Sequence, residues 1–588
     1  MMKMSNTKAI LLLLGLVIIS TGIYGQYDQK QVMMNQIRRL EARREFTQVL
    51  QIYEDLIEKY SDDQEIVSGY FNTLLNLNRI EAAAQVLEDY EELFAPDVFT
   101  QMNVSIMIRR GETSQARKAG MDYLRANPGN VAQYRNFALV YERERQFEIA
   151  IDVLELARST TSDDHIFAVE LARNYEQINN YPEAIGEYIN HLERNPGYLF
   201  FVTNRIKSIL DEDETGIRTL ENRLASSEDQ SLLELYALSL AHVGNLEDAF
   251  LVYQSLDPEK LNRFADELYV AGNINLARQA YEKYRKSITD PVKSAEVGIK
   301  IAQLYIGENQ LRQAQEVLSL IIDDIEIQDR QVRYRTRANR QARELLADIA
   351  IRLDDSQEEV IALFEDAKNF AFNRNEQKEL DLKVTHYLVM SENYKRAEDL
   401  LESILRNEPS GSQINNLGHY YRFMLDLMEN NDPSDSLLTE MIIGMPGNEL
   451  TGEALFLTVI FHEMIPQVRN TFLEAYRLKS IYKEDEALEK LLAIDKSIVD
   501  EEIMLITAQW ALEAGEYEIA EELFAHSFNN ETLLGYAILK LAELKKNRQQ
   551  EYREMLTDFL SEYPTHIFSP KFRLLLTAKQ PSTVRRPD

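Results

Sequence analysis

The sequence contains no cysteine among its 588 residues. Disulfide bonds, thiolate nucleophiles, zinc sites built on cysteine and a cysteine-linked lipid anchor are therefore excluded. Histidine is scarce, and no two of the eight histidines have the i, i+4 spacing that places both on one helix face. Phosphate-binding motifs of the types G-x-x-x-x-G-K-[S/T] and G-x-G-x-x-G and the nucleophile motif G-x-S-x-G are absent. We therefore predict no cofactor, no metal and no catalytic site.

Basic residues are outnumbered by acidic ones, 64 to 97, which gives a formal net charge of −33. Long-range repulsion from such a surface argues against nucleic acid or an anionic membrane as the main partner. The hydrophobic content of 45% is nevertheless ordinary for a chain that folds around a core.

No apolar run is long enough for a bilayer-spanning helix, which needs ~20 residues. The longest, from Ala9 to Ile19, has eleven apolar residues between a lysine-containing start and small residues. This pattern predicts a signal peptide over residues 1–25, with cleavage after Gly25 or, alternatively, after Gly22. We expect a periplasmic or secreted protein with no integral membrane span. An uncleaved N-terminal anchor is the alternative.

A repeat of about 34 residues organises the chain. Small residues recur at Val49, Ala83, Ala116, Ala150 and Ala184, with spacings of 34, 33, 34 and 34 residues. Mostly apolar residues stand three positions before and four after each of them, with Thr113 and Gly120 as the two departures. The pattern returns around the residues Ala249, Ala277, Ala314, Ala397 and Ala520. Such a period indicates a repeat architecture.

Each repeat has the pattern of two amphipathic helices that cross closely at alanines. A second alanine recurs twelve residues before the first, for example at Ala138 and Ala172. Glycine precedes the second helix at the positions Gly111, Gly244, Gly272 and Gly515, where a turn needs a permissive backbone. One hairpin cannot bury its apolar face alone, so the pattern predicts an all-α stack of antiparallel helix pairs.

The stretch YRNFALVYERERQFEIAIDVLELA and its successor resemble the tetratricopeptide repeat (TPR). The residues that match the family pattern are Tyr134, Ala138, Tyr141, Phe147, Ala150 and Pro196. The family's tryptophan is missing from every repeat, because the single Trp510 stands elsewhere. The resemblance implies a TPR-type α-solenoid, a right-handed superhelix whose first helices line a concave groove.

Interruptions of the pattern suggest the domain organisation. We expect a TPR solenoid over residues 26–430, including a degenerate repeat near Leu220, and a divergent helical region over residues 431–578 after the loop at Asn430. The run ALFLTVIF from Ala454 predicts a buried helix. Residues 579–588 have the composition of a disordered tail. The arginine-rich run DRQVRYRTRANRQAR extends a solvated helix or, alternatively, docks an acidic partner.

Two segments resemble metal sites incompletely. His462-Glu463 begins like the zinc motif H-E-x-x-H, but Pro466 replaces the second histidine. The acidic run from Asp211 resembles the start of a calcium loop, but position 12 is Asn222 instead of glutamate. Neither segment changes the expectation that no metal is bound.

The family's groove positions imply a set of partner-binding residues. Transferred repeat by repeat, they are Arg109, Arg135, Arg143, Arg173 and Asn262, together with Gln101, Glu176 and Asp266. Arg135, Arg143 and Arg173 would form a basic spot suited to a carboxylate. Alternatively, these arginines pair with neighbouring glutamates.

The function that we predict is a non-catalytic interaction scaffold that binds a protein or peptide partner of the cell envelope. One alternative is a glycan-capture protein like those of the SusD family, although these usually carry a lipidated cysteine. A lytic transglycosylase, the enzymatic alternative, needs a lysozyme-like domain after the solenoid. The repeat pattern around Ala508 to Phe524 leaves no room for such a domain.

Overall fold

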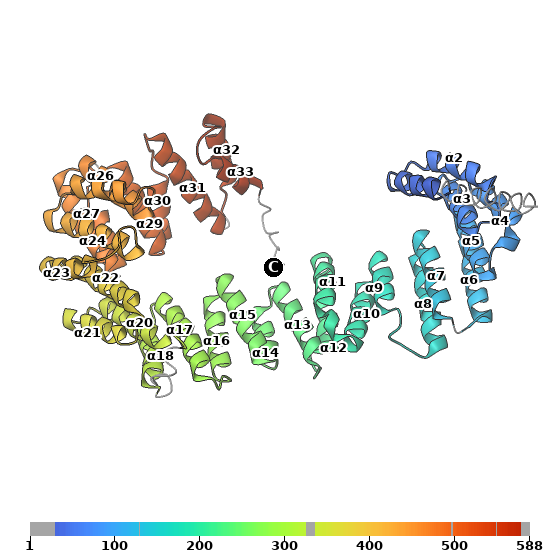
Figure 1. Ribbon diagram of the computed structural model, residues 1–588, viewed down its shortest axis with the longest axis horizontal. Helices are drawn as coiled ribbons and strands as arrows, with labels where there is room; N and C mark the ends of the chain where they lie inside the picture. Colours follow the sequence, from blue (N-terminus) through green and yellow to red (C-terminus); the bar gives the residue numbers. More distant parts are fainter. Residues whose placement is uncertain (1–29, 129, 325–334, 496–497, 549, 578–588) are drawn as a thin grey trace, which may run out of the picture. The chain divides into compact units, whose positions relative to one another are not determined.

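The computed structural model describes residues 30–128, 130–324, 335–495, 498–548 and 550–577 (Figure 1). Within these ranges every regular element is a helix and no strand occurs, which confirms the all-α prediction. The chain divides into two compact units, unit 1 up to Phe264 and unit 2 from Ala265 onward. The predicted signal peptide (residues 1–25) and tail (residues 579–588) lie outside the described residues.

Unit 1 is a succession of helix hairpins that begins with a helical segment over residues 30–42. Its further α-helices are α2 (Phe46–Ile57), α3 (Gln64–Asn76), α4 (Ile80–Asp89), α5 (Pro96–Arg109), α6 (Thr113–Ala126), α7 (Val131–Arg143), α8 (Phe147–Thr161), α9 (Ala168–Gln177), α10 (Tyr181–Arg194), α11 (Leu199–Glu212), α12 (Gly216–Leu224), α13 (Gln230–His242) and α14 (Leu246–Tyr253). Short 3₁₀ turns occupy Glu91–Leu93 and Pro196–Tyr198. The division between the units falls within α15 (Pro258–Val270).

Unit 2 continues with hairpins of the same kind. Its helices are α16 (Ile274–Arg285), α17 (Pro291–Gly307), α18 (Leu311–Asp323), α20 (Ala338–Arg352), α21 (Gln357–Lys368), α22 (Arg374–Met390), α23 (Tyr394–Leu405), α24 (Gln413–Asn430), α25 (Asp435–Gly444), α26 (Glu449–Glu463), α27 (Pro466–Ser480), α28 (Glu484–Leu492), α29 (Glu501–Glu513), α30 (Tyr517–Phe524), α31 (Glu531–Asn547), α32 (Arg553–Glu562) and α33 (Ser569–Thr577).

The recurring small residues lie where the paired helices cross. Val49, Ala83, Ala116, Ala150 and Ala184 are fully buried, and each belongs to the second helix of a pair. Neighbouring helices such as α7 and α8, or α9 and α10, pack directly against each other. The predicted register of the repeat is therefore confirmed.

Gly120, a departure from the pattern, is explained by its neighbour Tyr141. A Cβ atom at Gly120 would stand 2.3 Å from the Tyr141 hydroxyl oxygen. That hydroxyl donates a hydrogen bond to the carbonyl oxygen of Ala116 (2.8 Å). The third repeat therefore lacks a side chain here because the next repeat fills the space.

A residue with left-handed backbone conformation closes many of the hairpin turns. These residues repeat with the period of the array at Arg44, Asn78, Gly111, Arg145 and Asn179. The predicted turn glycines, Gly111, Gly244, Gly272 and Gly515, all have φ between +80° and +83°, a conformation that glycine adopts at little cost. The expected degenerate repeat near Leu220 is the pair α11–α12, whose second helix has only nine residues.

Part of unit 2 closes on itself. One hydrophobic cluster extends from Ala347 to Ile503 and therefore crosses residue 430, where the sequence predicted a boundary. Helix α27 packs against α22, Lys483 forms an ion pair with Asp354 (3.0 Å), and Arg477 pairs with Glu392. Helices far apart in the sequence thus share one core.

Helix α26 is only half buried, so the prediction of a buried helix from ALFLTVIF is wrong for one face. Leu457 and Phe461 are buried, whereas Leu455, Phe456 and Val459 are 45%, 49% and 47% exposed. Seven apolar residues interrupted only by Thr458 carry no periodicity that distinguishes the two faces. Among the described residues, no helix is both long and apolar enough to span a membrane.

The described arginines of the basic run are bound within unit 2. Arg337 pairs with Glu376 (2.9 Å), and Arg343 pairs with Asp366 and stacks over the Phe370 ring at 4.1 Å. Residues 325–334, which include the first part of the run, lie outside the described residues. The described arginines therefore hold adjacent helices together.

We expect the Ala184→Leu variant to lower the free energy of unfolding by about 1–3 kcal/mol, because added methylenes overpack a closed helix crossing. Ala184 is 0% exposed. Denaturant titration followed by circular dichroism measures the change. Ala132→Leu is the matched control, since Ala132 is an exposed residue of α7. Equal midpoints for the two variants would show that the assigned register is incorrect.

Candidate functional site

A pocket of about 510 Å³ lies in unit 1 where the first helices of three consecutive pairs meet. Helices α7, α9 and α11 each contribute side chains to it, and α8 adds Phe147 and Leu154. Three arginines and three glutamates line it: Arg135, Arg173, Arg205, Glu142, Glu170 and Glu176. A site that spans three repeats suits an extended ligand that lies across the helices.

Arg135, a predicted groove residue, is held by two contacts in this pocket. Its Nε donates to Glu170 Oε1 at 3.1 Å, and its guanidinium lies 5.0 Å from the centre of the Phe167 ring. Arg135 and Glu170 are 35 residues apart, about one repeat. The contact therefore links α7 to the first helix of the next pair.

Glu176 and Arg205 form the opposite wall of the pocket. Arg205 pairs with Glu176, and the Tyr188 hydroxyl donates to Glu176 Oε1 at 2.6 Å. Burial, together with this bond to a carboxylate, raises the pKa of Tyr188 to about 12. Glu176, also a predicted groove residue, is thus engaged within the protein.

Arg173 differs from the other two arginines. Its side chain is exposed at the pocket, and within the described part of the chain it forms no ion pair. Next to it, the buried amide nitrogen of Asn174 donates to Glu142 Oε1 (2.6 Å) and to the Glu170 carbonyl (2.8 Å). The Asn174 Oδ1 is buried and has no donor among the described residues. The pocket therefore retains one uncompensated cation and one unsatisfied acceptor.

The other predicted residues lie away from this pocket. Arg109 ends α5 and pairs with Glu144 at 2.5 Å. Arg143 is exposed at the end of α7 and forms no ion pair with any described residue. Asn262 lies on α15, and its Oδ1 is buried without a hydrogen-bond partner there. Of the predicted groove residues, the structure brings together Arg135, Arg173 and Glu176 in this pocket.

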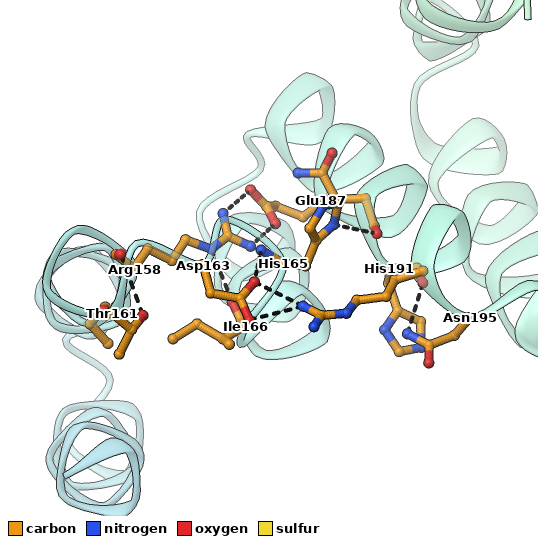
Figure 2. A network of polar contacts seen from close by, with 11 residues as sticks. Arg158, Thr161, Asp163, His165, Ile166, Glu187, His191 and Asn195 are labelled. Atoms are coloured by element: carbon orange, nitrogen blue, oxygen red, sulfur yellow. Dashed lines mark hydrogen bonds and ion pairs between the residues drawn. The ribbon is translucent and has the colours of Figure 1, made fainter. Parts of the chain in front are cut away.

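A polar network fixes the loop between α8 and α9 (Figure 2). Arg158 forms two hydrogen bonds with Glu187 (2.7 and 2.5 Å) and one with the Ile166 carbonyl (2.9 Å). Arg194 donates to both oxygens of Asp163 at 2.9 Å, and this contact lowers the pKa of the Asp163 carboxyl. The network joins α8, the loop and α10, and it fixes the segment next to Phe167, whose ring contacts Arg135.

The sequence pattern did not identify four further residues of this pocket, Glu142, Glu170, Asn174 and Arg205. The signal that could have found them is charge complementarity one repeat apart. Arg109–Glu144 and Arg135–Glu170 are both separated by 35 residues, and Glu176–Arg205 by 29. Opposite charges 29 to 35 residues apart, on first helices or at their ends, predict contacts between neighbouring repeats.

A second pocket, of about 570 Å³, lies in unit 2. It contains Asp266, another predicted groove residue, which accepts hydrogen bonds from Lys300 Nζ (2.6 Å) and the Tyr281 hydroxyl. These contacts lower the pKa of Asp266, although its burial alone would raise it. Glu308 of the same pocket is paired with Arg278 (3.2 Å). The charges of this pocket are thus compensated internally.

Two solved structures illustrate what the chain is similar to. A tetratricopeptide repeat protein from Parabacteroides merdae is 16% identical, with 49% of this chain and 98% of that protein aligned and a TM-score of 0.27. The matched chain in the structure of Naa15/Naa10 bound to HypK-THB is 14% identical in sequence. The alignment covers 92% of this chain and 77% of that chain, with a TM-score of 0.21. No family model and no curated protein matches the chain.

The fold assignment rests on the helix pairs themselves. The chain has antiparallel hairpins with a period near 34 residues, buried alanines where the helices cross, and a left-handed turn residue in many of the hairpins. The chain has the tetratricopeptide-repeat fold. In this fold the first helices of the TPR hairpins line one face of the array, and here α7, α9 and α11 together form the unit 1 pocket.

Proposed function

We propose that the chain is a non-catalytic scaffold that binds a protein or peptide partner of the cell envelope in the unit 1 pocket. The observation that carries this proposal is Arg173, an exposed cation in a pocket whose other arginines are already paired. A guanidinium is always charged and presents several donors to a carboxylate. We therefore assign to Arg173 an acidic side chain or a C-terminal carboxylate of the partner.

Apolar surface beside Arg173 supports a peptide as the ligand. Leu139, 40% exposed, and Phe201 supply apolar surface to the same pocket. The lining thus combines charged and apolar side chains, which suits a peptide that carries both kinds of side chain.

The composition of the pocket supports a binding role over catalysis. Its lining includes no histidine, lysine, serine or threonine. Two of its three glutamates are ion-paired with arginine, and the third accepts a hydrogen bond from Asn174. These carboxylates are occupied in holding repeats together, which leaves Arg173 to contact a partner.

The envelope location is proposed from the sequence. The apolar stretch from Ala9 to Ile19 and the small residues after it support export and removal of residues 1–25. Processing there would release a chain that begins near Gln26 in the periplasm or outside the cell.

We expect Arg173→Gln to weaken binding of an acidic octapeptide with a free C-terminal carboxylate by about tenfold, the loss of one charge-assisted hydrogen bond. Fluorescence anisotropy with the full chain measures the dissociation constant. Arg143→Gln removes another exposed arginine, which lies outside the pocket and forms no ion pair with a described residue. It is the matched control, with an expected change below about twofold.

Two outcomes would contradict the proposal. Equal effects of Arg173→Gln and Arg143→Gln would mean that the peptide responds to net charge alone. Capture of glycan but no protein from envelope extract by the wild type would favour glycan capture, like that of SusD proteins, as the function.

A further inference from the structure

A groove between the helices α31 and α32 of unit 2 is the feature that the proposed function does not use. It has a volume of about 510 Å³. Its floor is apolar, with Leu534 and Ile538 from α31 and Met555 and Phe559 from α32. Leu534, Ile538 and Met555 are only partly buried against the core of these terminal helices. The groove therefore leaves apolar surface accessible between two helices.

One bank of this groove is a row of carboxylates. Glu554, Asp558 and Glu562 follow one another at intervals of four residues, so they lie along one side of α32, and Glu551 stands just before the helix. All four are exposed, and none forms an ion pair with a described residue. Like charges at this spacing destabilise a helix by a few tenths of a kcal/mol per pair, a cost that a cationic partner would relieve.

The cations near the groove are already engaged. Lys545, the basic residue in its lining, pairs with Glu521 at 2.5 Å. Arg548 pairs with Glu518 (2.9 Å). Lys545 and Arg548 are thus paired with acidic residues of the preceding helix α30. The carboxylates of α32 have no cation as an ion-pair partner among the described residues.

We propose that the α31–α32 groove binds a basic amphipathic segment of a protein partner. Apolar side chains of the segment would pack against Leu534, Ile538 and Met555, while its lysines or arginines would face the carboxylates of α32. Helix α32 has ten residues, or about 15 Å at the rise of an α-helix. Three turns of an amphipathic helix match this length, and helix-in-groove binding uses apolar anchors at such spacing.

Charge argues against other occupants. The carboxylate row repels nucleic acid and anionic membrane surfaces. No group of three or more His, Cys, Asp or Glu residues in the described part of the chain is placed to hold a metal ion. A basic segment with apolar anchors complements both the carboxylate row and the apolar floor of the groove.

The test uses the full chain and a fluorescent 14-residue peptide of leucine and lysine with one apolar face. We expect the triple variant Glu554→Gln, Asp558→Asn, Glu562→Gln to weaken binding about tenfold at 0.15 M salt and to flatten its salt dependence. The triple variant Glu484→Gln, Asp485→Asn, Glu486→Gln is the matched control. It removes the same charge from three exposed acids of α28 that form no ion pair with a described residue, and its expected effect is below about twofold.

Two further measurements distinguish binding in the groove from non-specific attraction of a basic peptide to an acidic protein. A peptide with serine in place of leucine should bind at least tenfold more weakly than the amphipathic one, and Met555→Ala should weaken the amphipathic peptide at every salt concentration. Denaturant midpoints at or above the wild-type value for the α32 triple variant would verify its folding. No binding by the wild type, or equal losses in the two triple variants, would overturn the proposal.

Discussion

The Phe423→Ala variant is expected to lower the free energy of unfolding of unit 2 by about 3–5 kcal/mol, the usual cost of removing a buried aromatic ring. Phe423 of α24 is 0% exposed and belongs to the hydrophobic cluster that extends from Ala347 to Ile503. The cavity left by the ring would lie in a core that α20 to α29 share. Denaturant titration followed by circular dichroism measures the loss.

Phe456→Ala is the matched control for this variant. Phe456 lies on the exposed side of α26 and retains 49% of its surface, so its removal should cost less than about 1 kcal/mol. If Phe423→Ala lost no more stability than Phe456→Ala, α24 would not belong to the shared core. A transition that splits into two steps would indicate that the helices on either side of residue 430 unfold separately.

Unit 2 should also show two opposing pH dependences, the first from His386 of α22. Burial lowers the pKa of His386 to about 4, and its Nδ1 is buried without a partner among the described residues. Between pH 4 and 6.5 the unfolded chain binds the proton that the folded chain excludes. Stability contributed by neutral His386 is therefore complete above pH 6.5, and about 3 kcal/mol is lost as the pH falls toward 4.

Asp348 of α20 acts in the opposite direction. Burial raises the pKa of the Asp348 carboxyl to about 6, so between pH 3.8 and 6 the folded chain binds the proton more tightly than the unfolded chain. Stability therefore falls by about 3 kcal/mol as the pH rises through this window.

Single substitutions separate these two contributions. As the pH rises from 4 to 6, the free energy of unfolding of His386→Gln should fall, because only Asp348 still titrates in this variant. That of Asp348→Asn should rise, because only His386 still titrates. In the wild type the two contributions cancel. Denaturant midpoints at half-unit pH intervals measure the difference between the two variants, in which the titration of all other groups cancels. If the denaturant midpoints of the two variants changed with pH in the same way, the burial of His386 and Asp348 would be contradicted.

The fold could be predicted because every repeat needs the same type of residue at the same position of its helix pair. Only a small residue fits where two helices cross closely, so Ala116, Ala150 and Ala184 occur at a period that a single sequence shows. Helix α26 had no such signal. Its apolar run is uniform, and tertiary packing alone decides that Phe461 faces the core and Phe456 faces outward.

The candidate site was predicted only in part, because the pairing of charges depends on neighbouring repeats. Arg135 and Arg173 occupy equivalent helices and look alike in the sequence, yet Glu170 engages Arg135 and no described acid engages Arg173. Which arginine remains available is set by distances between side chains of different helices. A pattern along one chain indicates the face of a helix, but not these distances.

The closure of unit 2 has a consequence for the speed of folding. Described polar side-chain pairs in unit 1 span at most 35 residues, as in Arg135–Glu170, whereas Lys483–Asp354 spans 129 and Arg477–Glu392 spans 85. Closing a 129-residue loop costs about 1 kcal/mol more entropy than closing one of 35 residues. Unit 1 can form by local zippering from any repeat. Unit 2 must wait for distant helices to meet, and until then the apolar faces of α22, α24 and α27 stay exposed to aggregation or to a chaperone.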